Sequence, residues 1–178
     1  TSNPPESEVD ALEKDGYYRA ITYATIPVLW VSVVFNCIFL CSFSLSAMEW
    51  IATVIVTGSV LGFGLNVSHE LGHKLQKMPR KIALFNTALG VYGHFSIEHN
   101  RGHHRHVSTP EDLASSKMGE NIYQFACREI PGGAFRAWQL ESDRLHRQNK
   151  SSWHFENEIL QALCLSILVH GTLIGFYG

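Results

Sequence analysis

The stretch that decides the fold is ITYATIPVLWVSVVFNCIFLCSFSLSAM, at residues 21–48. It holds no Asp, Glu, Lys or Arg over 28 residues, which exceeds the roughly 20 apolar residues that a helix needs to cross the hydrocarbon core of a bilayer. Glu49 interrupts it, and residues 50–68 form a second uncharged run of 19 residues that begins with Trp50. Because Trp is common at membrane interfaces and the connection is short, we expect a transmembrane helical hairpin.

Residues 159–178 form a third uncharged run and predict a third transmembrane helix. The fold class that these runs predict is all-α, an integral membrane helical bundle. The chain begins with Thr1 and ends within an apolar run, so we expect residues 1–178 to be a single but partial membrane domain. The net charge of -2 gives no basic footprint for nucleic acid.

Basic residues indicate an orientation in the membrane. All 14 Lys and Arg lie outside residues 20–73 and outside the last apolar run, and four of them follow the predicted hairpin within residues 74–81. By the positive-inside rule, residues 69–158 are expected to face the cytoplasm.

Two histidine-rich motifs follow the predicted hairpin: HELGH at residues 69–73 and EHNRGHH at residues 98–104. His69 and His73 are four residues apart, so on a helix they share one face and can grip a metal. His99 and His103 repeat this spacing, and His104 adds a fifth imidazole. The predicted metal ligands are therefore His69, His73, His99, His103 and His104.

The number of imidazoles bears on the metal. HExxH is also the signature of zinc metalloproteases, in which the Glu is a general base, but a catalytic zinc takes three protein ligands. Five clustered imidazoles exceed that demand and suit a pair of iron ions. Glu70 and Glu98 each adjoin a predicted ligand; we expect them to orient imidazole N–H groups, and direct ligation of the metal is the alternative.

The other histidines carry weaker expectations. His94 is predicted to be a hydrogen-bonded core residue, and His106 a surface residue or a supporting neighbour of the ligands. His170 lies in the third apolar run, where an ionisable group is a candidate for function.

The region around the motifs predicts further helices. Residues 82–97 are apolar but short for a span, and favour a re-entrant or interfacial helix. Residues 119–148 predict two amphipathic helices broken at Pro131-Gly132-Gly133. Four arginines of this region form a candidate basic face for an acidic electron-transfer partner or for anionic lipid: Arg128, Arg136, Arg144 and Arg147.

Together these motifs resemble the bacterial alkane 1-monooxygenases (alkane ω-hydroxylases), within the wider class of histidine-box desaturases and hydroxylases. The resemblance covers essentially the whole chain. It rests on NPPE at 3–6, YYR at 17–19, HELGHK at 69–74, YGHF at 92–95, EHNRGHH at 98–104, MGE at 118–120, REIPG at 128–132 and ENEIL at 156–160.

The resemblance implies six transmembrane helices and a non-haem di-iron centre held almost wholly by histidines, in the bacterial inner membrane. It also implies terminal hydroxylation of medium-chain n-alkanes with O₂, using electrons from rubredoxin and its reductase. Carried over by position, the iron ligands are the five histidines named above. Two further histidine motifs of the family are absent, so this chain alone is expected to be inactive.

Three alternatives stay open on the residues. A fatty-acid desaturase or hydroxylase of the same class would act on an acyl chain. A membrane HExxH zinc metalloprotease would use the first motif and leave the second idle. A metal-binding or transport protein would have no catalysis.

Overall fold

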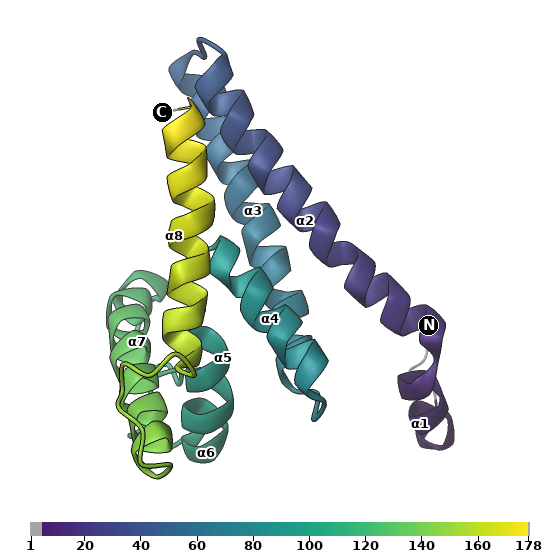
Figure 1. Ribbon diagram of the computed structural model, residues 1–178, viewed down its shortest axis with the longest axis vertical. Coiled ribbons are helices and arrows are strands. Elements are labelled where there is room, and N and C mark those ends of the chain that lie inside the picture. The colour runs from purple at the N-terminus through teal and green to yellow at the C-terminus, as the bar shows by residue number, and fades with distance from the viewer. Residues whose placement is uncertain (1–4, 178) are drawn as a thin grey trace. The chain divides into compact units, whose positions relative to one another are not determined.

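The computed structural model describes residues 5–177, apart from the side chains of Asp10, Glu13 and Lys14. The regular elements of this range are helical, which confirms the predicted all-α class (Figure 1). In chain order they are α1 (Glu6–Lys14), α2 (Gly16–Ser42), α3 (Ala47–Gly72), α4 (Lys77–Leu89), α5 (Phe95–Ile97), the π-helix η1 (Glu98–His103), α6 (His104–His106), α7 (Ile122–His146) and α8 (Glu158–Tyr177).

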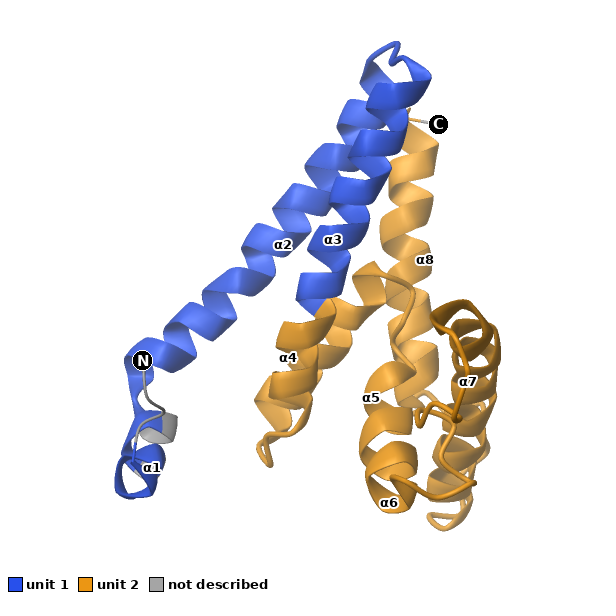
Figure 2. Ribbon diagram, turned by 180° about the vertical axis from the view of Figure 1, so that it is seen from behind, with its two compact units in different colours: residues 1–64 blue, residues 65–178 orange. Residues whose placement is uncertain are grey.

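Two compact units divide the chain, residues 1–64 and residues 65–178 (Figure 2). The first unit contains α1, α2 and most of α3. The second begins within α3 and contains both histidine motifs. Each unit is described by itself.

The three predicted spans correspond to α2, α3 and α8, which are long and apolar enough to cross a membrane. At most 17% of the most apolar window of each helix is buried within the structure. Large apolar side chains such as Phe35, Ile55 and Ile167 are more than half exposed. Apolar surface on this scale needs a non-aqueous environment, so these helices fit a membrane bundle.

The boundary between α2 and α3 differs from the prediction. We expected the first span to run to residue 48, but α2 ends at Ser42 and α3 begins at Ala47. The Glu49 carboxylate accepts hydrogen bonds from the backbone N–H of Ser46 (2.9 Å) and from its hydroxyl (2.7 Å). Ser-x-x-Glu is a helix-starting signature, so Glu49 begins the second span rather than interrupting the first.

The third span covers Glu158–Tyr177, as expected, while Gly178 lies outside the described residues. The other end of α3 extends past the predicted residue 68 to Gly72. His69 is therefore in the last turn of a candidate transmembrane helix.

Helix α8 packs against α4 and the turn that follows it. The Ser166 hydroxyl donates to the Ala88 carbonyl at 2.7 Å. A Cβ atom on Gly93 would lie only 2.1 Å from the Ala162 Cβ, so only glycine allows this close approach. In the same unit, buried Asn86 of α4 donates to Ser68 of α3 at 2.8 Å. These contacts fix α4 between the ends of two candidate spans.

Two predictions for the region after the first motif are wrong in their bounds. The helix expected over residues 82–97 ends at Leu89 and is followed by a turn, and a new helical segment begins at Phe95. The break expected at Pro131 is absent, because α7 runs unbroken through it. Pro131 removes one backbone hydrogen bond from the helix. The contacts of the next two residues offset this loss, because Gly132 packs on Leu113 and Gly133 on Glu98.

A buried carboxylate joins three elements of the second unit. Glu141 of α7 is fully buried. It accepts hydrogen bonds from Arg101 of η1 (2.7 Å), from Arg144 (2.7 and 2.8 Å) and from the backbone N–H of Glu158 (2.9 Å). Burial alone would raise the pKa of Glu141, but these donors lower it to about 2. A paired, ionised carboxylate thus ties the second motif to α7 and to the start of α8.

Candidate metal centre

Four of the five predicted ligands converge. His69 and His73 come from the end of α3, His99 from η1 and His104 from α6, and one ring nitrogen of each lies within 4.8 Å of all the others. Between Nε2 atoms, the distances are 3.1 Å for His69–His73, 3.2 Å for His73–His99 and 3.0 Å for His99–His104.

The winding of η1 decides which histidines meet. In a π-helix the backbone bond spans five residues, and the N–H of His104 donates to the His99 carbonyl. His104 therefore follows His99 on the same face, and their Nε2 atoms approach to 3.0 Å. The expected spacing of His99 and His103, four residues apart, assumed an α-helical turn; the π-turn instead brings His104 next to His99, and metal binding by His103 stays a prediction.

His103 lies beside the cluster with a different partner. Its ring stacks on His99 at 5.3 Å between centroids. Its Nδ1 lies 2.9 Å from the Asp112 carboxylate. Asp112 is buried and is itself held by the Ser115 hydroxyl (2.5 Å) and the Ala114 backbone N–H (3.1 Å). A carboxylate on one ring nitrogen fixes the tautomer that leaves the other nitrogen free to bind a metal.

Asp112 is a site residue that sequence reasoning missed. Its signal was weak, because it sits nine residues beyond His103 in the turn after Pro110. The orienting role was instead predicted for Glu70 and Glu98. Glu70 is exposed and pairs with Lys74 at 3.0 Å, so that prediction is wrong for the carboxylate of the first motif.

Glu98 is buried against α7, with its carboxylate 3.6 Å from the Arg136 guanidinium. Burial raises the pKa of Glu98. A Cβ atom on Gly102 would lie 2.4 Å from the Glu98 carboxylate. The glycine of the second motif therefore makes room for this side chain, and no hydrogen bond joins Glu98 to an imidazole among the described residues.

The remaining histidines stay outside the cluster. His94 Nε2 is buried without a hydrogen-bond partner in the described part of the chain, so the hydrogen bond expected there is missing. His106 ends α6 and is half-buried. His170 bonds through Nδ1 to the Ser166 carbonyl of its own helix at 2.8 Å, which gives that ring a structural partner.

Two of the four clustered histidines are harder to protonate than a free imidazole. Burial, and then the neighbouring imidazoles, lower the pKa of His99 to about 4. Burial and the rings of His69 and His104 also lower the pKa of His73. Neutral imidazoles keep the lone pairs that a metal needs.

The geometry fits a metal. With metal–nitrogen bonds of roughly 2.0–2.1 Å, ligand nitrogens around one ion lie about 3 Å apart, close to the observed Nε2 separations. Imidazole suits zinc, copper, iron and nickel alike, so the donor set points to a transition metal without fixing its identity. Both motifs contribute imidazoles to the cluster, whereas a metalloprotease would use only the first and would need Glu70 at the metal.

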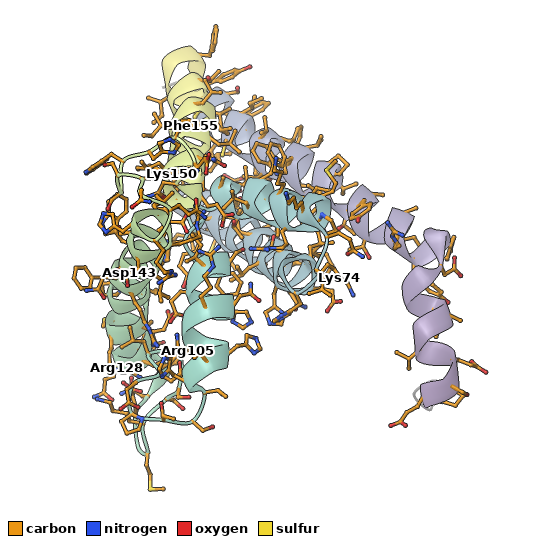
Figure 3. All side chains as sticks on the ribbon, turned by 60° about the horizontal axis from the view of Figure 1, so that its bottom comes forward. Lys74, Arg105, Arg128, Asp143, Lys150 and Phe155 are labelled. Carbon is orange, nitrogen blue, oxygen red and sulfur yellow. The ribbon has the colours of Figure 1, made fainter. Side chains whose placement is uncertain are left out.

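The candidate basic face of α7 is largely neutralised within the chain. Arg128 (Figure 3) bonds to the Glu120 carboxylate at 2.8 and 2.9 Å and to the Leu113 carbonyl at 2.8 Å. Arg136 donates to the Glu111 carbonyl at 2.7 Å, and Arg144 to Glu141. The predicted free face is therefore wrong for three of its four arginines.

Apolar helices that end in converging imidazoles define the class, a helical membrane protein with a histidine metal site. Residues 44–178 match the model of the family described as fatty acid desaturase, and the chain belongs to that family. Over 177 residues it is 46% identical to an alkane 1-monooxygenase of Pseudomonas putida and 45% identical to alkane 1-monooxygenase 1 of Alcanivorax borkumensis.

Each of these alignments covers 99% of this chain and 44% of the relative, so the chain spans less than half the length of these relatives. A xylene/toluene monooxygenase hydroxylase component of Pseudomonas putida is 31% identical over 114 residues, which is 64% of this chain and 31% of the relative. The resemblance inferred from the motifs is thus confirmed.

Proposed function

We propose that this chain is the histidine-motif part of a non-haem di-iron monooxygenase that hydroxylates the terminal carbon of medium-chain n-alkanes. The observation that carries the proposal is the convergence of His69, His73, His99 and His104 at the ends of candidate spans. The names and identities of the relatives support the alkane substrate.

The reaction consumes one O₂, two electrons and two protons, and it converts a terminal CH₃ group to CH₂OH with release of one water. Iron supplies the oxygen-activating chemistry when bound. Four converging imidazoles would hold the iron, and His103, whose ring Asp112 orients, would supply a fifth imidazole ligand. The remaining ligands belong to parts of the full-length protein beyond this chain.

The apolar helices support a site beside the bilayer, where alkanes dissolve. Rubredoxin and its reductase deliver the electrons. The site lies on the cytoplasmic side of the bacterial inner membrane. The basic residues at positions 74–81 support that orientation, because they follow a candidate span directly.

The test uses the full-length protein with rubredoxin, its reductase and NADH, and follows conversion of octane to 1-octanol by gas chromatography. His99→Ala should abolish product and lower the iron content. The matched control is His146→Ala, because His146 lies outside the cluster and bonds only to the Ser152 hydroxyl, at 3.1 Å, among the described residues.

Metal analysis separates the alternatives. About two irons per chain with octanol formation supports the proposal. One zinc without hydroxylation indicates a protease, and products from acyl substrates alone indicate a desaturase. This chain by itself should show no turnover, and turnover by it would contradict the proposed ligand set.

A further inference from the structure

A cavity of about 210 Å³ adjoins the end of α3 in the second unit, lined by residues other than the four clustered histidines. Five elements line it: Gly72 closes α3, α4 provides three cations and a leucine, α5 provides Ser96, η1 provides Asn100 and Arg101, and α8 provides Glu158 and Gln161. Because α3 and α8 are both candidate spans, the cavity lies where two of them end.

The cations of the cavity wall are Lys77, Arg80 and Lys81 of α4. All three are exposed, and no hydrogen bond or ion pair of their side chains occurs in the described part of the chain. The other two charged side chains that line the cavity, Arg101 and Glu158, balance each other and lie 3.4 Å apart. Arg101 also bonds to Glu141 at 2.7 Å. The cavity therefore carries about three uncompensated positive charges, in contrast to the neutralised arginines of α7.

Apolar side chains flank these cations on the outer surface. Leu75 is 95% exposed and Met78 is 66% exposed. Lys74, which precedes them, marks the end of α3 in Figure 3. Basic residues mixed with exposed apolar ones are typical of a segment that lies at a membrane interface, where Lys and Arg stems rest in the apolar layer and their charges reach the headgroups.

We propose that this cavity binds the phosphate of an anionic phospholipid headgroup. The three cations neutralise the phosphate, and Leu75 and Met78 contact the acyl region. A concave site of headgroup size at the ends of two spans favours a lipid over an acidic protein surface, which would need a broad flat contact. Basic pockets between membrane helices bind such lipids.

The experiment measures lipid retained by the detergent-solubilised full-length protein in native mass spectrometry. Dioleoyl phosphatidylglycerol and dioleoyl phosphatidylcholine are offered at equal concentration. We expect phosphatidylglycerol to be preferred, and the variant Lys77→Gln/Arg80→Gln/Lys81→Gln to lose that preference by at least about tenfold. The control, Arg19→Gln/Lys117→Gln, removes two exposed charges outside both the cavity and the arginine face of α7 and should retain it.

A second variant separates the cavity from general surface charge. Gln161→Trp fills the cavity and keeps every charge, so it should also weaken phosphatidylglycerol binding. Iron content and thermal midpoint close to those of the unmodified protein establish that each variant is folded.

Four results would overturn the proposal. The first is an equal loss of phosphatidylglycerol preference in the control variant, and the second is full lipid binding by Gln161→Trp. The third is displacement of the lipid by millimolar inorganic phosphate. The fourth is a Lys77→Gln/Arg80→Gln/Lys81→Gln variant that binds lipid as before but no longer binds a poly-glutamate probe. The third result would assign the cavity to a free anion, and the fourth to an acidic protein. None of them depends on alkane hydroxylation, so this proposal and the proposed function fail independently.

Discussion

At the scale of single residues, the contact between His103 Nδ1 and Asp112 gives a specific expectation. Asp112→Ala removes the group that fixes the tautomer and the ring orientation, so metal affinity should fall by about 10–100-fold. The measurement is the iron that the protein retains as the chelator concentration rises. A loss of fold stability alone would not lower this retention in proportion.

Two control variants accompany it. Ser115→Ala keeps the carboxylate and should have a smaller effect, although Ser115 bonds to Asp112 at 2.5 Å. Asp143→Ala removes an exposed carboxylate of α7 and should have none. Equal iron retention by Asp112→Ala and Asp143→Ala would show that Asp112 does not contribute to metal binding.

At the scale of elements, the Glu141 carboxylate that joins η1, α7 and α8 predicts a pH dependence. Its pKa falls from an ordinary value of 4.5 to about 2 in the folded protein. The folded state therefore binds the proton less readily than the unfolded state, so the stabilisation is complete above about pH 5 and is lost as the pH falls toward 2.

Thermal midpoints in detergent between pH 7 and pH 3 test this dependence. Glu141→Gln should lower the midpoint at pH 7 and flatten its decline on acidification, because the titrating group is gone. Glu8→Gln, which alters an exposed residue of α1, should leave the decline unchanged. An identical decline in Glu141→Gln would show that other carboxylates control it.

Sequence patterns predicted the elements unevenly, for physical reasons. Uncharged runs report lipid-facing surface directly, so all three spans were found. The turn at residues 43–46 was misplaced because the Ser46–Glu49 capping signal lies inside an apolar run. Continuity of α7 through Pro131 and the π-winding of η1 depend on packing by Gly102, Gly132 and Gly133, which composition does not reveal. Five histidines were predicted as ligands, and four of them converge; Asp112, the partner of His103, was not predicted.

At the scale of the whole molecule, α3 is an unbroken helix of 26 residues whose length fits a membrane crossing. Its two ends should then lie on opposite sides of the bilayer, with the basic end in the cytoplasm. In a variant without the four native cysteines, Gln76→Cys should react with a membrane-impermeant thiol reagent only in inside-out vesicles, and Ser44→Cys only in right-side-out ones.

The two positions control for each other, since both are exposed in the structure. Reaction of both from the same side would mean that α3 does not cross the membrane. The reverse pattern would leave α3 as a span but place the histidine cluster outside the cytoplasm.

The π-wound turn of η1 has a consequence for comparing such proteins. Residue spacing in this motif measures winding as well as chemistry: five positions in a π-turn bring a side chain to the place that four reach in an α-turn. A relative shortened by one residue between positions 99 and 104 could keep the same ring in the same place by winding as an ordinary helix. Alignment gaps inside the motif should therefore be tested as changes of helical pitch before they are interpreted as lost histidines.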